Sequence, residues 1–172
     1  MKKIIFVLAA VLALFLFGCN SISFDEGIAK ITDINAKHRA TMESYPADRQ
    51  EISSMISDFK NLQNLRVSGN SEAFGLALKY RILSLESGDS FVGASEFGTV
   101  GVTSDGFSCK PKPLILEAAQ LREQSAQKGF EAVDVLKQLV EKYPNEAQKL
   151  GLSAKTALLQ NATSYQVGEQ GK

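Results

Sequence analysis

The amino-acid sequence predicts an all-α fold, a bundle of five or six helices with one glycine-rich irregular or hairpin excursion at residues 88–112. Apolar residues recur at steps of three and four along most of the chain, which is the period of an amphipathic helix. Proline and glycine lie between these periodic stretches, where helices begin and end. A hydrophobic fraction of 44% and a charged fraction of 22% over 172 residues are typical of one globular domain.

Two helices are predicted first, over residues 24–43 and 46–66. The apolar stripe of the first helix contains Phe24, Ile28, Ile31, His38 and Met42. The stripe of the second contains Ile52, Met55, Ile56, Phe59, Leu62 and Leu65. Pro46 separates the two, because proline disfavours the α region for the residue before it and is well placed at the start of a helix.

The third helix, predicted over residues 72–87, is apolar around most of its circumference. Its apolar residues fall in two sets, Phe74, Ala77, Leu78, Ile82 and Leu85 on the one hand and Ala73, Leu76, Tyr80 and Leu83 on the other. A helix that is apolar on most sides is buried on most sides, so we expect this helix at the centre of the bundle. Gly88 is expected to end it.

Residues 88–112 show no helical period and are rich in glycine. A stretch of this length inside a compact domain is a functional loop, a small hairpin or a disordered segment. Its phenylalanines indicate packing, either against a partner or against the bundle itself. The candidate binding loop is defined by Phe91, Phe97, Phe107 and Cys109.

Helical periodicity returns at Pro113 and continues to residue 165, followed by a polar tail over 166–172. A break or C-cap is expected at Gly129, and a last helix is expected to start at Pro144.

Part of this region, residues 130–160, resembles a single tetratricopeptide-type helix pair. The resemblance rests on the stretch 132–144, which ends in Tyr143-Pro144, and on the alanines at 147 and 154. No second copy follows at the period of about 34 residues that defines such repeats, so an ordinary helical hairpin is the favoured interpretation.

The N-terminus resembles that of a prokaryotic lipoprotein. Lys2 and Lys3 precede fifteen uncharged residues, a run shorter than the roughly 20 residues that span a bilayer and typical of a signal peptide. The run ends in Leu16-Phe17-Gly18-Cys19, which resembles a lipobox: an aliphatic residue, a tolerant position, a small residue and a cysteine. An ordinary cleaved signal peptide and an uncleaved anchor helix are the alternatives.

The resemblance implies cleavage before Cys19 and attachment of lipid to its thiol. Residues 1–18 are then a signal peptide, 19–23 a lipidated tether and 24–165 a single helical domain. Several acyl chains give stable membrane anchoring, so the domain is expected on the extracytoplasmic side of the cell envelope. In bacteria with two membranes, the residue that retains lipoproteins in the inner membrane is an aspartate after the cysteine. Asn20 occupies that position here, which favours the outer membrane.

Net charge argues against a nucleic-acid partner. Removing residues 1–18 removes two lysines and no acidic residue, so the mature chain carries 17 basic and 19 acidic side chains. Nonspecific binding to nucleic acid depends on clustered lysine and arginine, and no such cluster is present in this sequence.

The composition also excludes several kinds of chemistry. One histidine and two cysteines cannot build a zinc site of four cysteines, or of two cysteines and two histidines, and they cannot build a framework of several disulfides. His38 is expected to be a packing residue with one hydrogen bond. Cys109 is expected to be a buried inert thiol, half of an intermolecular disulfide or a reactive group. We therefore expect no catalytic residue, no metal and no cofactor.

These observations predict a membrane-anchored lipoprotein whose helical domain is not an enzyme and binds a protein partner or contributes to the envelope. The alternative is a bundle that binds a small ligand, with the 88–112 loop as a lid over an apolar pocket.

Overall fold

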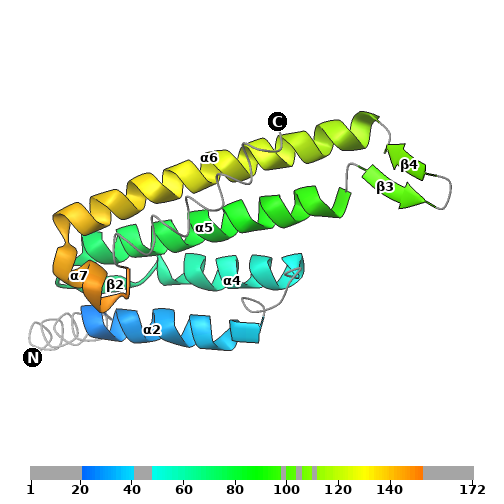
Figure 1. Cartoon of the computed structure of the whole chain (residues 1–172). Coiled ribbons are helices and arrows are strands. Elements are labelled where there is room, and N and C mark those ends of the chain that lie inside the picture. The colour runs from blue at the N-terminus through cyan, green and yellow to red at the C-terminus, as the bar shows by residue number, and fades with distance from the viewer. Residues whose placement is uncertain (1–20, 41–47, 98–99, 104–105, 110–111, 153–172) are drawn as a thin grey trace, which may run out of the picture.

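A computed structural model describes residues 21–40, 48–97, 100–103, 106–109 and 112–152, and the side chains of these residues except in 98–112. Within this part the chain forms an all-α bundle of five helices with two very small sheets, which confirms the predicted fold class (Figure 1). The helices are α2 (Phe24–Lys37), α4 (Arg49–Leu62), α5 (Ser71–Phe97), α6 (Lys112–Lys142) and α7 (Pro144–Lys149). The strands are β1 (Ser21–Ser23) and β2 (Arg66–Ser68), which pair in parallel, and β3 (Val100–Thr103) and β4 (Gly106–Cys109), which form an antiparallel hairpin.

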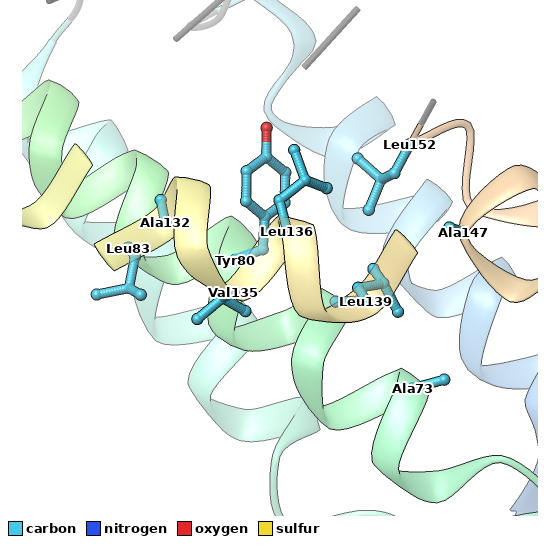
Figure 2. Packing of buried hydrophobic residues seen from close by; sticks show 10 residues of the cluster. Ala73, Tyr80, Leu83, Ala132, Val135, Leu136, Leu139, Ala147 and Leu152 are labelled. Atoms are coloured by element: carbon cyan, nitrogen blue, oxygen red, sulfur yellow. The ribbon is translucent and has the colours of Figure 1, made fainter. Parts of the chain in front are cut away.

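Helix α5 is central, as its two apolar sets predict. One face packs against α6 and α7 in a cluster that we call the α6-side core (Figure 2). Its buried members are Ala73, Ala77, Tyr80, Leu83, Ala132, Val135, Leu136, Leu139, Ala147 and Leu152. The other face packs against α2 and α4 in a cluster that we call the α2/α4-side core. Its buried members are Ile31, Met55, Phe59, Phe74, Leu78 and Ile82.

The predicted end of this helix at Gly88 is wrong, because α5 continues to Phe97. Glycine inside a helix costs about 1 kcal/mol relative to alanine, and contacts with neighbouring helices outweigh that cost here. Around Gly88, Asp89 pairs with Arg49 of α4 and Ser87 bonds Ser125 of α6. Glycine at position 88 locally disfavours the helix, but the contacts of α5 with α4 and α6 outweigh this preference.

The second helix break predicted from glycine, at Gly129, is also wrong, because α6 runs without interruption from Lys112 to Lys142. Directly before this glycine, Lys128 forms an ion pair with Glu86 of α5, and three residues after it Ala132 is fully buried. Helix α6 is therefore held along α5 on both sides of the glycine.

The remaining helices are shorter than predicted. α2 is capped by Ser23 and ends with His38 as its C-cap, and α4 starts after the N-cap Asp48 and not at Pro46. α7 begins at Pro144, as expected, and has six residues. In the region that resembles a tetratricopeptide helix pair, the described residues therefore form the end of the long helix α6 and the short helix α7. The signal-peptide and lipobox residues, positions 41–47 and the predicted helical and tail residues 153–172 lie outside the described residues.

Candidate functional site

The chain enters the bundle through the parallel sheet. Ile22 of β1 is opposite Val67 of β2, and Ser68 Oγ donates a hydrogen bond to the Ile22 carbonyl oxygen over 3.2 Å. Ser23 then caps α2: its Oγ accepts from the Glu26 N–H, and the Glu26 carboxylate accepts from the Ser23 N–H. The bond from the Ser23 backbone lowers the pKa of Glu26. Residues 21–23, which belong to the predicted lipidated tether 19–23, are thus fixed to the domain.

The predicted binding residues lie at the other end of the bundle, where α5 ends and α6 begins (Figure 1). Phe91 and Phe97 belong to helix α5, whereas Phe107 and Cys109 belong to strand β4, so these four residues do not form one loop. The hairpin interpretation is confirmed for residues 100–103 and 106–109, which pair as antiparallel strands. We call this region, the last turns of α5, the first turns of α6 and the hairpin, the distal end.

Apolar side chains are exposed at the distal end. Phe91 is 39% exposed and Leu116 of α6 is 54% exposed, while Phe97 is half-buried. In the backbone register of the hairpin, Cys109 is opposite Val100, close to the helix ends. The side chains of Phe107 and Cys109 lie outside the described residues, so the structure does not choose among the states of Cys109.

His38 lies between α2 and α4 and is only 3% exposed. Its Nε2 is 2.9 Å from Asp58 Oδ2 and its Nδ1 is 3.3 Å from Glu51 Oε2. The prediction of a single hydrogen bond is therefore wrong. Residues 51 and 58 are two helical turns apart on one face of α4, which brings both carboxylates to the same ring. Hydrogen bonds from His38 and from Lys37, whose Nζ is 2.7 Å from the same Asp58 oxygen, lower the pKa of Asp58.

A cleft of about 240 Å³ opens where α4, α5 and α6 meet. The described residues that line it are Ile56, Glu86, Asp89, Ser90, Gln124, Gln127 and Lys128. Its charged groups already have partners of opposite charge. Glu86 pairs with Lys60 at 3.0 Å and with Lys128 at 3.1 Å. Burial alone would raise the pKa of Glu86, but hydrogen bonds from the two lysines lower it.

The same side of the bundle holds a second ionic contact. Arg49 of α4 makes two hydrogen bonds to the Asp89 carboxylate, at 3.0 and 3.1 Å, which raise the pKa of the guanidinium. The guanidinium lies over Gly93 of α5, where an added Cβ would be 3.0 Å from Arg49 Cζ. These ion pairs connect helices, and the sequence does not predict them because their partners lie 26 or more residues apart with no local pattern.

A second cleft, also of about 240 Å³, lies beside β2 and is lined by Gln63, Leu65, Val67, Ser71, Phe74, Gly75 and Leu78. Both volumes are below the roughly 300–1,000 Å³ of typical small-molecule sites. Their described lining residues come from the helices, from β2 and from the turn before it. The hairpin lies beyond the ends of α5 and α6 (Figure 1).

Among the described residues, histidine, cysteine and carboxylate side chains do not gather into a group of three or more that could hold a metal ion. Of the helices described, none is both long and apolar enough to cross a membrane.

Comparison with known proteins gives no relative. No family model matches the chain, and neither a curated protein nor a solved structure matches it significantly.

Proposed function

We propose that this protein is a membrane-anchored lipoprotein of the cell envelope whose non-enzymatic helical domain binds a protein partner through its distal end. The observation that carries the anchoring is the sequence Leu16-Phe17-Gly18-Cys19 after two lysines and fifteen uncharged residues. Lipid on Cys19 places the domain on the extracytoplasmic side, and Asn20 favours the outer membrane where an organism has one.

A non-enzymatic role is supported by the surroundings of the one histidine in the sequence. Both ring nitrogens of His38 are occupied by carboxylates, and the ring is buried between two helices. A general base must reach the proton that it removes, within hydrogen-bonding distance of a substrate. His38 instead joins α2 to α4, and the same is true of Asp58, which also binds Lys37.

Binding at the distal end is supported by exposed apolar side chains that lie outside the two core clusters. Phe91 and Leu116 expose aromatic and aliphatic surface that contributes binding energy when a partner covers it. A small-ligand function has less support, because the charges in the cleft between α4, α5 and α6 are already paired.

The anchoring is tested by Cys19→Ser in the full-length protein, with Cys109→Ser as the matched control. We expect Cys19→Ser to remain unprocessed or to leave the membrane fraction. Cys109→Ser should keep the mature mass with attached lipid and should partition into detergent. If Cys19→Ser retains the same mature mass and the same detergent partitioning as the natural protein, the lipoprotein proposal is wrong.

A further inference from the structure

We infer that the end of the bundle formed by Ser21–Ser23 and residues 63–70, which we call the tether end, is a surface that rests on phospholipid headgroups. The distal end then points away from the bilayer. This inference rests on the proposed lipidation of Cys19 and goes beyond it, because lipidation alone does not fix how a domain is oriented. Three observations on the described residues support it: the fixation of β1, the chemistry of the tether end and the length of the helical hairpin.

The fixation of β1 leaves almost no free chain between the lipid and the fold. Consecutive Cα atoms are about 3.8 Å apart, so the Cα of Cys19 lies within about 7.6 Å of that of Ser21. Ser21 is paired with Arg66, and Ser23 is paired with Ser68 and caps α2. A lipid on Cys19 is therefore attached within two residues of a hydrogen-bonded sheet, and the domain has little freedom to tumble around it.

The tether end has the composition expected of a surface in contact with headgroups. Its sequence, Ser-Ile-Ser and Gln-Asn-Leu-Arg-Val-Ser-Gly-Asn, contains one charged residue, Arg66, which is exposed and suited to contact a phosphate. Two carboxylates nearby have cationic partners: Asp25 pairs with Lys149 at 3.0 Å and Glu72 with Lys142 at 3.4 Å. Glu26 and Glu146 instead accept hydrogen bonds from Ser23 and Asn70 of the tether end, so Arg66 is the one charge within the tether end itself.

The two ends are separated by the length of α5. Strand β2 leads into the start of this helix and β3 follows its end, so the tether end and the hairpin lie at opposite ends of the bundle (Figure 1). A helix of 27 residues is about 40 Å long at 1.5 Å per residue. When the tether end rests on the bilayer, Phe91 and the hairpin stand well above it, accessible to a partner in the envelope.

The test compares two labelled positions in the full-length, lipidated protein, in a Cys109→Ser background. Asn64→Cys places a fluorophore at the tether end and Ser95→Cys places one near the end of α5; both natural residues are exposed. The protein is reconstituted in vesicles of phosphatidylethanolamine and phosphatidylglycerol that contain a phospholipid with a nitroxide on its headgroup. We expect strong quenching at position 64 and at least a five-fold weaker effect at position 95.

A second variant separates orientation from anchoring. Ten Gly/Ser residues inserted after Asn20 leave the lipobox and β1 intact but add a flexible linker whose root-mean-square length is about 17 Å. The linker variant should keep its lipid, as shown by intact mass, while quenching at position 64 falls toward that at position 95. Equal quenching at the two positions in a lipidated protein without the linker overturns the orientation alone. A mature mass without lipid overturns both the orientation and the proposed anchoring.

Discussion

The two sides of α5 are packed by opposite means. The α6-side core is rich in alanine, with Ala73 and Ala132 fully buried, and it extends along two long helices. The α2/α4-side core is built from large residues, such as Met55 and Phe59 on the short helix α4 and Phe74 on α5. Small residues allow two helices to approach closely over many turns, whereas large ones fill the wider space between short helices.

One pair of polar contacts on the α6 side shows the same close approach of the helices. Ser87 and Ser125 each donate a hydroxyl hydrogen bond of 2.8 Å to the backbone carbonyl of the other, which is possible only when α5 and α6 are close together. On the opposite side, longer side chains bridge the helices, as in the bonds of His38 to α4 and of Arg49 to α5. The side chains between α5 and α6 are therefore smaller than those between α5 and the helices α2 and α4.

The largest expected loss of stability concerns the α2/α4-side core. Phe59 is completely buried between α4 and α5, so Phe59→Ala removes apolar contacts and leaves a cavity. We expect the free energy of unfolding to fall by about 3–5 kcal/mol, measured by urea denaturation. Ser53→Ala, on the exposed face of the same helix, should change it by less than about 0.5 kcal/mol. Equal effects of the two substitutions would contradict the assignment of this face to the core.

The second prediction is that a larger side chain in the alanine-rich α6-side core lowers the free energy of unfolding. Ala132 has no exposed surface, and Ala132→Leu forces a larger side chain between α6 and α5. We expect a loss of about 1–3 kcal/mol in the free energy of unfolding, because overpacking displaces well-fitted neighbours. Ala119→Leu, on the exposed side of α6, is the matched control and should be nearly neutral. Tolerance of leucine at position 132 would mean that the two helices are not closely packed there.

The division of α5 into two buried faces can be predicted from the sequence. The two apolar sets of α5 follow the helical period, so they identified both faces of this helix before any partner was known. Ala77 is the exception, since it was grouped with Phe74 but packs on the α6 side. The helix breaks predicted at Gly88 and Gly129 are wrong, because both helices continue through these glycines. The local cost of about 1 kcal/mol for a glycine is smaller than the stabilisation from the tertiary contacts of a long helix pair.

Contacts between distant segments were beyond sequence reasoning. The pairing of β1 with β2 joins three-residue strands more than 40 residues apart, too short to show an alternating pattern. For His38, the periodicity placed the ring on the apolar stripe correctly but gave no means of choosing Glu51 and Asp58 as its partners. The predicted binding positions Phe91 and Phe97 were chosen for their residue type, and their place on a helix follows from packing alone.

Acid should weaken the α2/α4 side before the α6 side. The pKa of Asp58 is lowered in the folded protein, so its ion pairs stabilise the fold above the ordinary aspartate pKa of about 3.9. That contribution is lost as the pH falls through this value toward the lowered pKa, because the carboxyl group must then be protonated. Between about pH 5 and pH 2 we expect amide hydrogen exchange to increase more in α2 and α4 than in α5 and α6, because the apolar contacts of the longer α5–α6 pair do not titrate.

The control for this acid effect is Asp58→Asn, which removes the titrating group. Its free energy of unfolding should be lower at neutral pH and should depend less on pH over the acidic range. The α6 side also has carboxylates with a lowered pKa: hydrogen bonds from Tyr143 and Lys142 lower the pKa of Glu72, and those from Lys60 and Lys128 lower the pKa of Glu86. The bonds between Ser87 and Ser125 involve no titrating group and should not respond. A uniform increase of exchange over α2, α4, α5 and α6 would show that the two sides unfold as one unit.

The smallest expected effect on stability, and the largest on function, concerns the hairpin at the end of the α6 side. Residues 98–111 connect α5 to α6, and antiparallel helices commonly need only about 2–8 connecting residues. Replacing 98–111 by four Gly/Ser residues should change the free energy of unfolding by less than about 1 kcal/mol, because a shorter flexible connection alters loop entropy only slightly. Helices α5 and α6 keep their contacts with each other in the shortened protein. These contacts include the hydrogen bond of Ser125 to Ser87 and the buried side chain of Leu139.

The functional part of this last prediction is read from cross-linking in cells. A photoreactive residue at position 91 should form a cross-link to a protein partner in the natural chain and lose it in the shortened one. The same residue at position 53, on the exposed face of α4, should form no such cross-link in either chain. A large cooperative loss of stability in the shortened protein would show instead that the hairpin packs onto the bundle as core. The phenylalanines at the distal end would then have a structural role, and the partner would have to be sought on another surface.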